Sequence, residues 1–265
     1  VTLRDQGSNA LLGTTPTKGN LFAVAAKLPS NAAAPCSVAV EANLGSEKIV
    51  GTAAVRSAAG TCRTYTVTLS GLVTDQPIPF ATVTVTIGGV TYTTVADKDG
   101  RYSLPIASAS LDALLKIEAA GNDPVTGEPI EFVNLVGSFS RVLSDQQADG
   151  SADANVTNVT TASYVLVLQA NDGQEPTSDA DLRRAETSVD ATQLLQLAAL
   201  IKLIVDDPGY TLPDGETSLL EFISKPEAVT AYLETVPQED LDAIVANREL
   251  LRLALDNLVD MARGY

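Results

Sequence analysis

Paired aspartates are the residues whose type and spacing most directly suggest chemistry. Asp97 and Asp99 lie in TVADKDGRYSLPI at residues 94–106, and Asp75 precedes them. Carboxylates two residues apart, followed by a glycine, also occur in the ligand loop of calcium-binding EF-hands. The stretch is therefore a candidate for a metal site, a catalytic pair or a turn between two strands.

The positions around Gly100 favour the turn. If Gly100 takes the glycine position of a calcium loop, Val95 falls at the first ligand position and Ile106 at the twelfth, where an EF-hand needs carboxylates. We therefore predict a structural turn at residues 97–100, in which aspartate side chains accept hydrogen bonds from local backbone amides. Calcium bound by the three carboxylates is the alternative.

A second acidic cluster lies in DQQADGSAD at residues 145–153. Asp145, Asp149 and Asp153 surround Gly150, without the closing glutamate of a calcium loop. We interpret this stretch as a solvated linker, again with calcium as the alternative ligand. No other cofactor is indicated.

The absence of histidine from all 265 residues excludes whole classes of mechanism. It rules out Ser/His/Asp and Cys/His nucleophilic sites and histidine-based zinc or haem sites. An enzyme built on carboxylates stays possible, and Glu118, Glu128 and Glu131 lie near one another in sequence. Nothing in the pattern positions a substrate between them, so we predict a protein that is not an enzyme.

Cys36 and Cys62 are the two cysteines, and they flank a region rich in predicted strands. A disulfide between them would contribute about 3 kcal/mol by the chain-entropy estimate and would indicate an oxidising compartment. The alternative is two buried thiols. No CxxC motif is present to distinguish the two.

Charge and hydropathy limit the partners. The formal net charge is −16, which repels phosphate backbones, so we do not expect nucleic acid to bind. The longest apolar run, LLQLAALIKLIV at residues 194–205, is too short to span a bilayer, so no transmembrane segment is expected. No signal peptide is recognised, so a secreted protein would be present in its mature form.

Residue patterns predict an α+β multidomain chain, in which an antiparallel β-sandwich is followed by an all-α helical domain. Residues 36–143 hold about seven short runs rich in Val, Thr and Ile, many of them alternating, with Gly88-Gly89 marking a tight hairpin. Residues 1–35 form an N-terminal extended segment, which could pair with its own sandwich or with a neighbouring copy.

The remainder of the chain is predicted to be largely helical. Residues 144–187 form a connecting segment with a possible helix in TNVTTASYVLVLQAN, and residues 188–265 form the helical domain. Pro226 and Pro237 suit first turns of helices. The last predicted helix carries an apolar stripe, for which packing on neighbouring helices is the simpler reading and a partner the alternative; its members are Leu241, Ile244, Val245, Leu251, Leu255, Leu258 and Val259.

The stretch SGLVTDQPIPFATVTVTIGGVTYTTVADKDGRYSLPI, residues 70–106, resembles the carboxypeptidase regulatory-like domain, a prealbumin-like (transthyretin-like) sandwich of bacterial surface and secreted proteins. The family more often has Thr-Asp where this chain has Ala96-Asp97. The resemblance implies a non-catalytic module and a hairpin turn at Asp97–Gly100. It rests on Gly71, Val73, Asp75, Pro79, Ala81, Val83, Val85, Thr94, Asp97, Asp99, Gly100 and Tyr102.

These observations together predict an exported bacterial protein, secreted or at the cell surface (extracellular or periplasmic). We expect a structural or adhesive role, of which one form is a subunit of an extracellular assembly or filament. The expected partners are other surface proteins or copies of the protein itself. The alternative is a module that binds carbohydrate or another ligand. For that function Tyr65, Tyr92 and Tyr102 are the candidate residues for stacking on a sugar.

Overall fold

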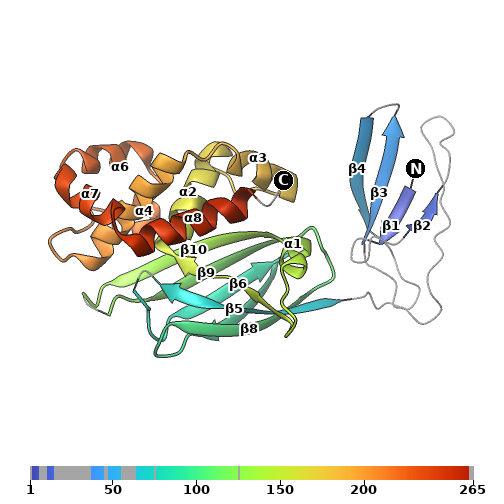
Figure 1. Ribbon diagram of the computed structural model, residues 1–265, viewed down its shortest axis with the longest axis horizontal. Coiled ribbons are helices and arrows are strands. Elements are labelled where there is room, and N and C mark those ends of the chain that lie inside the picture. Colours follow the sequence, from blue (N-terminus) through green and yellow to red (C-terminus); the bar gives the residue numbers. More distant parts are fainter. Residues whose placement is uncertain are drawn as a thin grey trace.

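The computed structural model describes residues 64–262 except 75 and 125, together with the backbone of four strands nearer the N-terminus. Those four strands form an antiparallel sheet of their own, with the order β2-β1-β3-β4 (Figure 1). Their bounds are Thr2–Asp5 (β1), Leu11–Thr14 (β2), Ser37–Leu44 (β3) and Glu47–Ala54 (β4).

The N-terminal sheet differs from the sequence prediction, which placed β3 and β4 in the same sandwich as the strands that follow. β3 pairs with β1 along one edge and with β4 along the other, so both of its edges are used within the small sheet. β1 therefore pairs within its own chain. The predicted disulfide between Cys36 and Cys62 lies outside the described residues.

Two further four-stranded sheets follow residue 64. One is antiparallel with the order β10-β9-β6-β7, and the other is centred on β5, which pairs with β8 on one edge and with the short strands β11 and β12 on the other. Their bounds are Tyr65–Thr74 (β5), Thr82–Ile87 (β6), Val90–Val95 (β7), Arg101–Ser108 (β8), Leu114–Asn122 (β9), Pro129–Ser138 (β10), Ser151–Asp153 (β11) and Val156–Thr157 (β12).

Period-two alternation buries one face of each of these sheets. Val67 on β5 lies opposite Ile106 on β8, and Val85 on β6 lies opposite Ile117 on β9; all four side chains are buried in one cluster. Apolar side chains that alternate with exposed polar ones therefore account for the core between the sheets. The predicted β6–β7 hairpin is confirmed.

The C-terminal region is helical, as predicted, and its helices lie on the β10 side of the sheets (Figure 1). The buried cluster continues from the strands into these helices. The helices are Phe139–Ser144 (α1), Asn158–Ala170 (α2), Asp179–Glu186 (α3), Ala191–Asp206 (α4), Leu219–Ile223 (α5), Pro226–Leu233 (α6), Gln238–Val245 (α7) and Arg248–Ala262 (α8).

The helix expected in the connecting segment is α2, and its polar residues fix its position. Thr157 caps it through a reciprocal pair of hydrogen bonds with Thr160. Hydroxyls of α2 also complete the edge of β10: the Val133 N–H donates to Thr161 Oγ1 at 2.9 Å, and Thr160 Oγ1 donates to the Val133 carbonyl at 2.9 Å. At Val133 the helix thus satisfies backbone groups that a further strand would otherwise pair.

The last predicted helix is two helices, α7 and α8. The side chain of Asn247 accepts hydrogen bonds from the backbone N–H groups of Glu249 and Leu250, which begins a new helix at this point. Among the described helices none has by itself the length and hydropathy of a membrane span. Only α3 and α4 taken together meet that test, and they are bent by 93°.

Candidate functional site

The Asp97 carboxylate is used by its own turn. It accepts hydrogen bonds from the backbone N–H groups of Asp99 at 2.8 Å and Arg101 at 2.9 Å, and these hydrogen bonds hold the pKa of Asp97 below its ordinary value. Gly100 has φ = +72°, a conformation that other residues adopt with strain. The predicted structural turn is confirmed. It is not a hairpin turn, because β7 pairs with β6 in one sheet and β8 pairs with β5 in the other.

The calcium alternative gains no support from the turn. Asp99 pairs with the neighbouring Lys98 at 2.7 Å, and Asp75 is outside the described residues. Within the described part of the chain, no three acidic or cysteine side chains gather as a metal site would require.

The linker interpretation of residues 145–153 is wrong at its C-terminal end. Ser151–Asp153 is β11, which pairs in parallel with β5. Asp149 accepts from both the backbone N–H and the hydroxyl of Ser151, which lowers its pKa, and Asp153 accepts from Gln147 at 2.9 Å. Asp145 is exposed. These acidic residues build a turn that leads into a strand.

The three tyrosines proposed for stacking on a sugar do not form an exposed aromatic surface. Tyr102 is buried, and its hydroxyl donates to the Ala154 carbonyl, so its ring cannot stack on a sugar at the surface. Tyr92 is half-buried and donates to the Ala107 carbonyl at 2.7 Å. Tyr65 is also half-buried and packs against the core.

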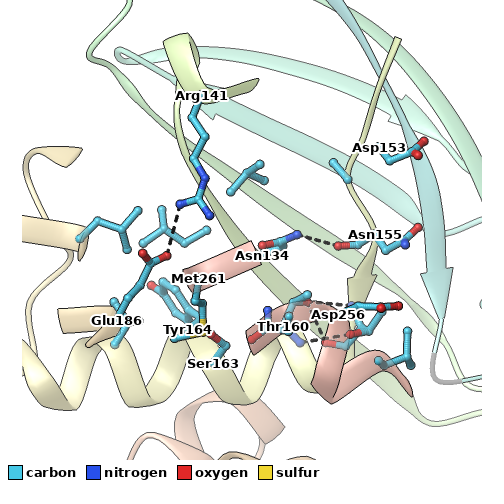
Figure 2. A pocket seen from close by; sticks show the side chains of 18 residues that line it. Asn134, Arg141, Asp153, Asn155, Thr160, Ser163, Tyr164, Glu186, Asp256 and Met261 are labelled. Carbon is cyan, nitrogen blue, oxygen red and sulfur yellow. Dashed lines mark hydrogen bonds and ion pairs between the residues drawn. The ribbon is translucent and has the colours of Figure 1, made fainter. Parts of the chain in front are cut away.

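A cavity of about 160 Å³ lies where β10, the segment around Asn155, and helices α1, α2, α3 and α8 meet (Figure 2). Its wall combines apolar side chains such as Val167, Leu182 and Met261 with the ring of Tyr164. The Tyr164 hydroxyl donates to Glu175 at 2.7 Å. The mixture of an aromatic ring, apolar groups and convergent polar groups is typical of a small-molecule site.

Arg141 and Glu186 form an ion pair at one end of the cavity (Figure 2). Their closest atoms are 3.6 Å apart, and the two side chains are only 15% and 6% exposed. Burial raises the pKa of Glu186 to about 7, and Asp179 adds to this effect, whereas Arg141 and Arg183 oppose it. The Glu186 carboxyl therefore changes charge near neutral pH, in a chain that has no histidine.

Two acceptor atoms of the cavity residues are buried without a hydrogen-bond partner: Glu186 Oε2 and Asn257 Oδ1. A third polar group is weakly used, because the Ser163 hydroxyl donates only to the thioether of Met261, at 3.6 Å. Unpaired buried acceptors are costly, so water or another molecule that donates hydrogen bonds would stabilise this site. Sequence patterns gave no sign of this cavity.

None of the glutamates considered for catalysis lines the cavity. Glu118 pairs with Lys116 at 3.2 Å on the surface of β9, and Glu131 receives a long 3.4 Å hydrogen bond from Ser218. Glu128 is exposed. The structure does not bring these three carboxylates into the described cavity.

A second candidate site is the outer face of α8. Leu251, Leu255 and Val259, called here the α8 stripe, are 42%, 62% and 39% exposed. They lie at four-residue intervals and so share one side of the helix. The predicted packing of the apolar stripe is confirmed for the other four members, Leu241, Ile244, Val245 and Leu258. It is wrong for the three exposed positions, where Leu250, Leu253, Ala254 and Met261 are buried instead.

No family model matches the chain, and searches of curated proteins and of solved structures find no significant similarity.

Proposed function

We propose that the protein is a non-catalytic, exported surface protein with a structural or adhesive role, and that its copies associate through the α8 stripe. The exposure of the stripe is the observation that carries the proposal. Large apolar side chains lined up on one face of a helix are typical of a surface that a partner covers.

A second copy of the chain is the partner that the flanking charges favour. Arg252 and Asp256 lie one turn apart on the same flank of the stripe. Two α8 helices paired antiparallel about Leu255 would place the same flanks together. Arg252 of each copy would then lie about 3 Å along the axis from Asp256 of the other, since each residue rises 1.5 Å. The contact is self-complementary, as a two-fold interface requires.

The expected association is weak. A standard interface buries about 800 Å² per partner, and three side chains supply less than that. We therefore expect a dissociation constant on the order of 10⁻⁵ M or weaker. Weak pairwise contacts of this kind suit an assembly in which each copy is also held by other contacts.

The remaining parts of the proposal rest on the sequence. The resemblance of residues 70–106 supports a prealbumin-like sandwich formed by the two sheets after residue 64. The acidity, the predicted disulfide and the missing catalytic residue types support export and a non-catalytic role.

Mixing two charge variants tests the pairing. Arg252→Glu and Asp256→Arg each place like charges across the proposed contact, so each variant alone should be monomeric by light scattering up to about 1 mM. An equimolar mixture should form a dimer, because the glutamate introduced in one variant then faces the arginine introduced in the other, and the unchanged Asp256 faces the unchanged Arg252. Charge effects within one helix are the same alone and in the mixture, so only a contact between copies explains recovery.

Val90→Glu is the matched control, because Val90 is a similarly exposed apolar residue at the β6–β7 hairpin, 52% exposed. It should self-associate as the wild type does, whereas Leu255→Glu should remain monomeric. A wild type that is monomeric at every concentration would refute the proposal. Loss of association in Val90→Glu but not in Leu255→Glu would place the interface at the hairpin instead.

A further inference from the structure

We propose that the cavity between β10, α2, α3 and α8 binds a small neutral polyhydroxylated molecule, a polyol or a monosaccharide. The proposal goes beyond the assembly role and does not rest on it, because the α8 stripe is not part of the cavity wall. Asp256 belongs to both the proposed contact between copies and the cavity wall, so the binding test uses variants at other positions.

The unpaired atoms define what the ligand must donate. Glu186 Oε2 and Asn257 Oδ1 both accept and cannot satisfy each other, so the occupant must supply at least two donors. Glu186 comes from α3 and Asn257 from α8, on different walls of the cavity. A molecule with several hydroxyls along a short chain or ring can reach both.

Charge selects a neutral ligand. Arg141 and Glu186 already balance each other in a largely buried setting. An anionic ligand would add a second negative charge beside Glu186, and a cationic one would add a second positive charge beside Arg141; each leaves a net charge away from water. Hydroxyl groups can donate to Glu186 and accept from Arg141 or Ser163 at no such cost.

Size and shape agree with this class. A cavity of about 160 Å³ holds about five water molecules at about 30 Å³ each. A polyol of four to six carbons could replace them, with its C–H faces against Tyr164 and Val167. The elevated pKa of Glu186 agrees with a carboxyl that is kept from bulk water.

Binding should be measured directly, because polyols raise the melting temperature of most proteins by exclusion from their surfaces. Isothermal titration and saturation-transfer NMR of the intact chain at pH 8 would use erythritol, xylitol, glucose, galactose and N-acetylglucosamine. Gluconate, an anion, and N-methylglucamine, whose alkylamine stays protonated at pH 8, serve as charged probes of similar size. We expect saturable binding of at least one neutral probe and none of either charged probe.

Glu186→Gln and Asn257→Leu should each weaken that binding about tenfold or more, since each removes one acceptor. The exposed Glu221→Gln is the matched control and should bind as the wild type does. Near-ultraviolet circular dichroism establishes that each variant is folded. If no neutral probe shows saturable binding, the cavity holds water alone and the proposal is overturned. Tighter binding of a charged probe, or affinity unchanged in both variants, would overturn it equally.

Discussion

Helices α2 and α8 break the usual rule of burial in opposite ways. α2 buries polar side chains, among them Asn158 and Thr161, whereas α8 exposes Leu255 and Val259. In α2 each of these polar groups has a hydrogen-bond partner: the Asn158 amide donates to the Ala198 carbonyl, and Thr161 accepts from Val133. The exposed side chains of α8 have no comparable explanation within the described fold. Buried polar groups therefore mark architecture here, and the exposed α8 stripe is the surface for which we propose a partner.

The largest expected effect is a difference in the free energy of unfolding between substitutions on the buried and on the exposed side of α8. Leu250→Ala removes a side chain that is 2% exposed and should lower the free energy of unfolding by about 3 kcal/mol. Leu255→Ala should change it by less than about 0.5 kcal/mol. Urea denaturation at micromolar concentration measures both, below the range of self-association. Equal losses would mean that the stripe is covered within the monomer.

A somewhat smaller effect is expected in α2. Thr161→Val keeps the shape of the side chain but leaves the buried Val133 N–H without its acceptor, and should lower the free energy of unfolding by about 2 kcal/mol. Thr161→Ser keeps the hydroxyl and should cost about half as much, by urea denaturation under the same conditions. If serine proved more harmful than valine, packing and not the hydrogen bond would position α2.

Glu186, in the wall of the cavity between α2 and α8, should make the free energy of unfolding depend on pH. The folded-state pKa of Glu186 is about 7, above the ordinary value of 4.5, so the folded chain binds the proton more tightly than the unfolded chain. The stability from this proton is complete below pH 4.5 and is lost as the pH rises through 7. We expect the free energy of unfolding to fall by about 2 kcal/mol between about pH 5 and pH 8.

Glu186→Gln should flatten that pH profile, measured by urea denaturation across the same range. Carboxylates with lowered pKa values, such as Asp97 and Asp149, lose their contribution only at lower pH and do not interfere. An unchanged slope in Glu186→Gln would assign the titration to another group.

The smallest effect is expected at Arg252. The side chains of its ion pairs with Glu249 at 2.6 Å and Asp256 at 2.9 Å are more than half exposed to solvent. Arg252→Ala should therefore change the free energy of unfolding of the monomer by less than about 0.5 kcal/mol. Thermal denaturation at low and high salt measures this, and a loss above about 1 kcal/mol would give Arg252 a structural role.

Local patterns were enough to predict much of the fold. Gly88-Gly89 between alternating strands predicted the β6–β7 hairpin, and the residues Asp97–Gly100 predicted the turn between β7 and β8. Both features depend on neighbouring residues alone. The helical C-terminal region followed from three- and four-residue spacing. The helix α2 was also anticipated, although its uniform burial hides the usual periodicity.

What escaped prediction depends on contacts between distant residues. β11 and β12 are too short to carry a strand pattern and exist because β5 offers them an edge. The α8 stripe was misread because Leu251 and Leu250 look alike in sequence, and only the break at Asn247 decides which one faces inward. Glu186 and Asn257 are distant in sequence, so their convergence could not be seen before the fold.

The pairing of β12 with β5 also decides how the molecule would respond to mechanical load. These strands run parallel, with Val156 opposite Val73 and Thr157 opposite Thr74. A pull between the N-terminal sheet and the helices enters β5 at its first residue and leaves β12 at its last, so the ladder is sheared and its hydrogen bonds bear the force together. Forced unfolding depends on the rate of unfolding, which this geometry slows. A tethered surface protein would gain tensile strength from a strand of only two residues.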